Sequence, residues 1–107
     1  MNIPELNNFL TLADLLHFGQ ASRACNLSPS ALTRSIQRLE EEVGHPLFTR
    51  DNRSVALTPA GVRFQTYARQ ARQEWQEFQE SLATEPAVSG PLSLYASITA
   101  VYSLLPD

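Results

Sequence analysis

Apolar residues near the start of the chain recur at spacings of three and four, the period of a helix with one buried face. From Pro4 onward these positions are Leu6, Phe9, Leu10, Ala13 and Leu16. Asn2 stands just ahead of them, where its side chain can cap the backbone N–H groups of the first turn. The pattern therefore predicts an amphipathic helix over residues 4–16.

A short helix and a second amphipathic helix follow directly. The short helix begins after Gly19, and Asn26 supplies a turn because asparagine tolerates the left-handed backbone. Ser28 then caps the next helix, Pro29 takes its first position, where a missing N–H costs nothing, and Gly44 ends it. The apolar stripe of that helix is Leu32, Ile36, Leu39 and Val43. Two helices joined by a tight turn are expected here.

The spacing changes after Gly44. Leu47 and Phe48 lead into a polar stretch, and residues 55–57 are mainly apolar again, which is typical of two short strands around a turn. Thr58 and Pro59 then repeat the cap-and-proline signal and predict a long helix. Along that helix two rows recur every seven residues, namely Phe64, Ala71 and Phe78, and Ala68, Trp75 and Leu82.

The two heptad rows form an apolar stripe that needs a second surface to cover it. Packing within the same chain is one solution, but little chain remains to provide it. The stripe therefore favours self-association, with the six residues of the two rows as the dimerisation surface.

The composition changes again after residue 84. Residues 85–91 are typical of a hinge, and residues 92–107 look like the first strand and helix of an α/β domain that is cut short. The expected fold class is mainly α: three helices and a two-stranded wing, followed by a long dimerisation linker helix and the start of a truncated α/β effector domain. The domains are a winged helix-turn-helix at 1–58, with the helix-turn-helix at about 18–37, and the linker helix at 59–84, followed by the hinge and the truncated domain.

The net negative charge of the chain is unevenly distributed along the sequence. The net charge of −3 argues against a nucleic-acid binder, but all of this excess lies beyond residue 65. Every one of the eight basic residues is arginine, whose planar fork can bind phosphates and guanine edges through two hydrogen bonds.

Other functional classes find little support in the sequence. No apolar stretch is long enough to span a bilayer, and the N-terminus lacks a signal peptide. Cys25 is the only cysteine, and the two histidines, His17 and His45, are far apart and belong to no catalytic or metal-binding motif. We therefore expect a cytoplasmic protein that is not an enzyme, contacts no membrane and holds no cofactor or metal in this chain.

The polar face of the predicted helix at 28–44 carries residue types that read DNA. A B-form major groove admits one helix, whose N-terminal residues lie nearest the base edges. Arginine can bind guanine and glutamine can bind adenine through paired hydrogen bonds. The acids Glu40, Glu41 and Glu42 are kept to the far end of the helix. The first two turns carry Ser30, Thr33, Arg34, Gln37 and Arg38.

Arg53, at the tip of the predicted hairpin, is the candidate for contacting the adjacent minor groove or its phosphate wall.

Two alternatives to DNA binding stay open. The polar face could be an ordinary solvated surface, and the winged helix could be a protein-interaction module without DNA binding, since the whole chain is acidic.

Residues 18–61, FGQASRACNLSPSALTRSIQRLEEEVGHPLFTRDNRSVALTPAG, resemble the DNA-binding domain of LysR-type transcriptional regulators. The matching features are Ala-x-x-Ala in the second helix, Ser-Ala-Leu-Thr-Arg-x-Ile-x-x-Leu-Glu in the third, Gly-x-x-Leu-Phe-x-Arg before the wing and Leu-Thr-x-Ala-Gly at the start of the long helix. The resemblance implies DNA contacts at the start of the third helix and at the wing, from Ser28, Pro29, Ser30, Thr33, Arg34, Gln37 and Arg53.

The resemblance also implies partners. The linker helices would pair as an antiparallel homodimer, the full-length protein would be a homotetramer on an interrupted dyad operator, and RNA polymerase is a further candidate partner. Within the family the chain is similar to activators of branched-chain amino acid biosynthesis. A C-terminal domain, nearly all of it absent from this chain, would then bind acetolactate or acetohydroxybutyrate as inducer.

Overall fold

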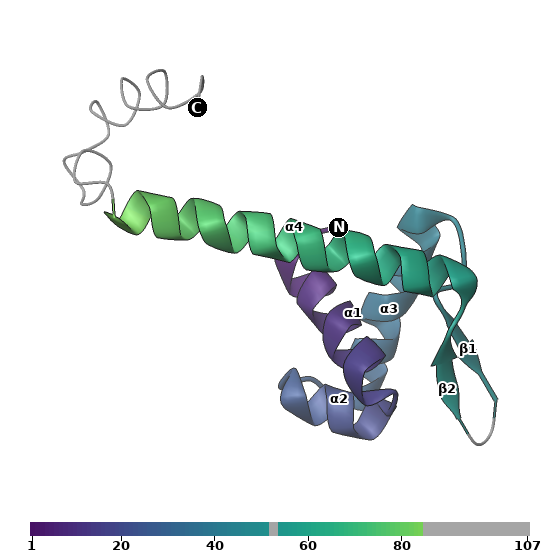
Figure 1. Ribbon diagram of the computed structural model, residues 1–107. Helices are drawn as coiled ribbons and strands as arrows, with labels where there is room; N and C mark the ends of the chain where they lie inside the picture. The colour runs from purple at the N-terminus through teal and green to yellow at the C-terminus, as the bar shows by residue number, and fades with distance from the viewer. Residues whose placement is uncertain (52–53, 85–107) are drawn as a thin grey trace. The chain divides into compact units, whose positions relative to one another are not determined.

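The computed structural model describes residues 1–51 and 54–84, which form four helices and one two-stranded sheet (Figure 1). Residues 1–72 form one compact unit, and α4 continues beyond it. This arrangement confirms the predicted mainly helical fold with a wing, whereas the predicted hinge and truncated domain lie outside the described residues. The elements are α1 (Ile3–Leu15), α2 (Phe18–Ala24), α3 (Pro29–Val43), β1 (Phe48–Arg50), β2 (Val55–Leu57) and α4 (Pro59–Thr84).

A reciprocal capping box starts α1. The Asn2 side chain accepts a hydrogen bond from the Glu5 backbone N–H at 2.9 Å, and the Glu5 carboxylate accepts one from the Asn2 N–H at 3.1 Å. The helix ends at Leu16, whose backbone is left-handed (φ 50°). That turn leaves Leu16 40% exposed, so its prediction as a core residue was wrong, and Leu12 is buried instead.

The short helix α2 begins at Phe18, before the predicted start after Gly19, because His17 caps it. Its Nδ1 accepts a hydrogen bond from the Gln20 N–H at 2.9 Å, as a neutral imidazole nitrogen can. The turn into α3 follows the prediction: Asn26 is left-handed (φ 57°), and Ser28 accepts the Ala31 N–H at 3.1 Å. Gly44 ends α3 with a φ of 84°, a conformation that favours glycine.

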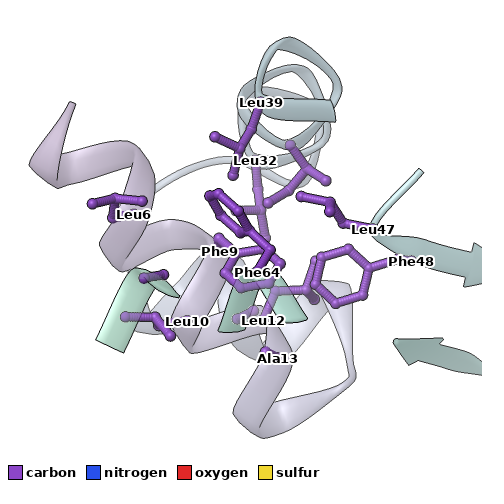
Figure 2. Close-up of a cluster of buried hydrophobic side chains, with 13 residues drawn as sticks. Leu6, Phe9, Leu10, Leu12, Ala13, Leu32, Leu39, Leu47, Phe48 and Phe64 are labelled. Carbon is purple, nitrogen blue, oxygen red and sulfur yellow. The ribbon is translucent and has the colours of Figure 1, made fainter. Parts of the chain in front are cut away.

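The core is organised around the fully buried ring of Phe9 on α1 (Figure 2). The Phe9 ring centroid lies 5.4 Å from that of Phe48 on β1 and 4.9 Å from that of Phe64 on α4. The Phe64 contact is edge-to-face, a favoured geometry for aromatic pairs. Further fully buried apolar side chains complete the core, among them Leu12, Leu32, Ile36, Leu39 and Leu47.

The wing is tied to the start of α4 by hydrogen bonds around Thr58. In the antiparallel hairpin Phe48 lies opposite Leu57. The Thr58 N–H donates to the Leu47 carbonyl at 3.0 Å, and its hydroxyl donates to the Pro46 carbonyl at 2.7 Å. The same hydroxyl accepts the Gly61 N–H at 2.9 Å and so caps α4, as predicted.

Gly61 is buried where α4 meets the loop before β1. A Cβ atom added there would lie 2.0 Å from the Leu47 carbonyl oxygen, which is backbone and cannot move aside cheaply. This close approach explains a glycine inside a helix, where alanine is normally favoured by about 1 kcal/mol.

We expect Gly61→Ala to lower the free energy of unfolding by about 1–3 kcal/mol, because the clash outweighs the gain in helix propensity. Urea denaturation followed by circular dichroism measures the change. The control is Gln70→Ala at an exposed position of α4, which should stay within about 0.5 kcal/mol of the wild type. A Gly61→Ala variant as stable as the control would contradict the close approach.

Candidate nucleic-acid interface

The apolar stripe of α3 holds its polar face outward. Leu32, Ile36 and Leu39 are fully buried and Val43 is partly buried, as the periodicity predicted. Ser35 is buried as well, and its hydroxyl accepts a hydrogen bond from the Asn8 side-chain amide on α1 at 3.2 Å. The helix is thereby fixed in rotation, so the residues on the opposite side face solvent.

The structure brings seven of the eight predicted DNA-contact residues together on α3 and its cap. Thr33 is half-buried. The other six are exposed: Ser28, Pro29, Ser30, Arg34, Gln37 and Arg38. Arg53 lies outside the described residues. One helix therefore presents hydroxyl, amide and guanidinium groups within its first turns, which is the chemistry of base edges and phosphates.

The start of α3 is well suited to an anion. Ser28 caps the helix, and its hydroxyl lies 3.3 Å from that of Ser30. A helix start carries a partial positive charge and backbone N–H groups that point outward. A DNA phosphate near Ser28 would meet both.

The three glutamates at the far end of α3 have separate environments. The Glu40 carboxylate accepts the backbone N–H groups of Leu47 at 2.7 Å and Phe48 at 3.2 Å, which joins the end of α3 to the start of the wing. Sequence reasoning missed this role, because only the fold brings those N–H groups to Glu40. Glu41 is exposed. Glu42 lies 2.7 Å from the N-terminal ammonium, and this hydrogen bond raises the pKa of that amine above its ordinary value.

Arg38 lies at the edge of the polar face that adjoins α1. Its Nε is 3.6 Å from Oε2 of Glu5, while the arginine side chain stays 63% exposed. Arg38 thus has a carboxylate beside it before any partner arrives.

The predicted dimerisation surface needs a correction. Phe64 and Ala68 are buried in the core of their own chain, and Ala71 packs partly against it, because the first part of α4 covers α1. Phe64 and Ala68 are therefore not available to a second chain. Trp75 and Phe78 are 44% and 52% exposed, with ring centroids 6.0 Å apart, and Leu82 is half-buried.

Comparison with known proteins identifies the family. Residues 3–62 match the family described as bacterial regulatory helix-turn-helix protein, lysR family. The chain belongs to the LysR family. The family is the one that the sequence predicted, and the match covers the whole helix-turn-helix and wing.

Two curated LysR-type relatives are similar over nearly the whole chain. The transcriptional activator IlvY of Salmonella typhimurium is 47% identical over 99% of this chain, and the transcriptional regulator IlvY of Escherichia coli is 46% identical over 99%. The chain spans only 36% of the length of either relative. Both relatives are transcriptional regulators rather than enzymes.

The similar solved structures include complexes with DNA. DarR of Vibrio fischeri in complex with DNA matches 84% of this chain and 31% of its own, with 29% identity and a TM-score of 0.78. The complex of the BenM DNA-binding domain with benA site 1 DNA matches 76% of this chain and 94% of its own, with 30% identity and a TM-score of 0.72.

Neither a membrane-spanning helix nor a metal cluster is found in the part of the chain that the structure describes. No helix there is long and apolar enough to cross a bilayer. The same residues hold no group of three histidine, cysteine or acidic side chains placed to bind a metal ion.

We expect Glu40→Ala to lower the free energy of unfolding by about 1–3 kcal/mol, because two partly buried N–H groups lose a charged acceptor. Glu40→Gln should cost less, since its amide oxygen can still accept. Urea denaturation measures both changes, with Glu41→Ala as the exposed control. Equal effects of Glu40→Ala and Glu41→Ala would show that the carboxylate does not anchor the wing.

Proposed function

We propose that the chain recognises an interrupted dyad operator as a homodimer and activates a gene of branched-chain amino acid biosynthesis. The observation that carries the DNA-reading part is the exposed polar face of α3, held outward by a fully buried stripe of Leu32, Ile36 and Leu39. The similarity to IlvY proteins supports the choice of gene and of activation.

The residues of α3 take different roles in this proposal. Both Arg34 and Gln37 have exposed side chains. Arg34 reads guanine in the major groove by donating to O6 and N7, and Gln37 reads adenine by donating to N7 and accepting from N6. Ser28, Pro29, Ser30 and Thr33 sit at the helix start, beside the phosphates and the first bases. Arg38 and the wing residue Arg53 contact the DNA backbone or the minor groove.

The proposed dimer forms along the exposed end of α4. Trp75 and Phe78 present aromatic surface, and Ala71 and Leu82 extend it at helical spacing. The full-length protein would be a homotetramer in the cytoplasm, where it meets its operator and RNA polymerase. Its C-terminal domain would bind acetolactate or acetohydroxybutyrate.

We expect Arg34→Ala to weaken binding to the operator by about 1–3 kcal/mol and to relax the preference at one base pair. Selection of bound duplexes from a random pool first gives the operator and half-site spacing. Fluorescence anisotropy then compares operator and scrambled duplexes. The control is Arg72→Ala on α4, which removes the same charge from an exposed position outside α3.

Equal weakening of the operator and the scrambled duplex would make Arg34 a phosphate contact. The salt dependence tests the proposal as a whole, because the logarithm of the affinity of a DNA binder falls with the logarithm of the salt concentration. A protein that binds no duplex at low salt would contradict the proposed function and favour a protein-interaction module.

We expect replacement of both Trp75 and Phe78 by glutamine to shift the protein from dimer toward monomer, because an apolar interface is lost. Sedimentation velocity measures the shift. The control is Val62→Gln, which is also exposed but lies two residues before Phe64, on the opposite side of the helix. An unchanged dimer would place the interface elsewhere.

A further inference from the structure

A polar groove runs between the start of α1 and the outer side of α3. Its volume is about 410 Å³, and it lies beside the polar face that carries the proposed base contacts. Arg34 and Arg38 supply two guanidinium groups from α3, and Glu5 and Asn8 contribute from α1. The groove is therefore mostly cationic on one wall and has one carboxylate on the other.

Glu5 uses its two carboxylate oxygens differently. Oε1 accepts the Asn2 N–H at 3.1 Å and so belongs to the capping box of α1, and it lies 3.5 Å from the N-terminal ammonium. Oε2 is the atom 3.6 Å from Nε of Arg38. Since the helix cap holds one oxygen in place, the other is held at the side of the arginine.

The contact between Glu5 and Arg38 is loose. A separation of 3.6 Å is longer than a hydrogen bond, and the arginine is 63% exposed, so the pair contributes little stability. A phosphate could replace the carboxylate through two short hydrogen bonds from the guanidinium fork. The charge of Arg38 is thus partly compensated by Glu5, but its guanidinium group remains able to bind a phosphate instead.

We propose that Arg38 in this groove contacts the sugar–phosphate backbone of DNA, and that Glu5 is an internal competitor of the phosphate for Arg38. The inference rests on the proposed function and adds Glu5 as the residue that limits phosphate affinity. In the unbound protein Glu5 compensates the charge of Arg38. On binding, Arg38 exchanges the carboxylate for a phosphate, and the cost of that exchange weakens the complex whatever the base sequence.

The test compares the wild type with Glu5→Gln, Arg38→Gln and the double variant. Glutamine keeps an acceptor oxygen and is itself a capping-box residue, so Glu5→Gln removes the charge while retaining the helix cap. Fluorescence anisotropy over a series of salt concentrations gives the affinity for an operator duplex and for a scrambled duplex. Thermal unfolding checks that the variants stay folded.

Glu5→Gln should tighten binding to both duplexes by about two- to five-fold at low salt, the range expected for loss of one weak ion pair. Its salt slope should steepen by up to about 0.9, since no carboxylate is left without its arginine, and so able to take up a cation, when Arg38 neutralises the phosphate. In the Arg38→Gln background the same change should give no gain. Arg38→Gln alone should weaken both duplexes by the same factor, a prediction that does not depend on how Glu5→Gln folds.

The matched control is the pair formed by Asp14 and Arg69, whose charged atoms are 3.8 Å apart at the other end of α1. Asp14→Asn removes the same charge at a second, longer and more exposed pair, and should leave DNA affinity nearly unchanged. An equal gain from Asp14→Asn would overturn the proposal in favour of a general effect of net charge.

Three other outcomes would also overturn it. They are no gain from Glu5→Gln, a gain that persists without Arg38, and a gain confined to the operator, which would make Arg38 a base contact. A wild type that binds neither duplex would instead refute the proposed function, so the two failures are distinguishable.

Discussion

The fully buried ring of Phe9 makes the contacts on which the arrangement of residues 1–72 depends. Its edge-to-face pair with Phe64 and its tilted pair with Phe48 join α1 to α4 and to the wing in one cluster. Aromatic pairs of this kind add about 0.5–1.5 kcal/mol each beyond the burial of their area. The apolar stripe of α3 packs into the same core, so the angle between α3 and the wing is set by apolar packing rather than by the exposed polar residues of α3.

Polar interactions then secure the edges of this core. Glu40 at the end of α3 and Thr58 before α4 approach the segment at residues 46–48 from two elements and bond its backbone groups. Gly61 lets α4 lie directly on the Leu47 carbonyl. Glu40, Thr58 and Gly61 hold the wing and α4 in place relative to α3. None of the three belongs to the polar face at the start of α3.

Much of the local structure could be predicted from the sequence because the interactions that decide it span only a few residues. The caps at Asn2, Ser28 and Thr58 bond backbone groups three positions away, and Gly44 takes the left-handed conformation at its own position. Helical periodicity likewise identified the buried stripe of α3 and, by elimination, its polar face. The same signals missed His17, since a histidine is an uncommon cap.

The sequence by itself therefore determined the helices, the wing, the LysR family and the polar face of α3. Only the tertiary structure decided which residues distant in sequence contact one another. Phe64 and Ala68 fit a dimer seam by their spacing, yet α1 covers them, because their burial depends on which helix packs there. Arg38 looked like any exposed arginine until α1 brought Glu5 beside it. Periodicity identifies a face, but only packing of separate segments determines what that face meets.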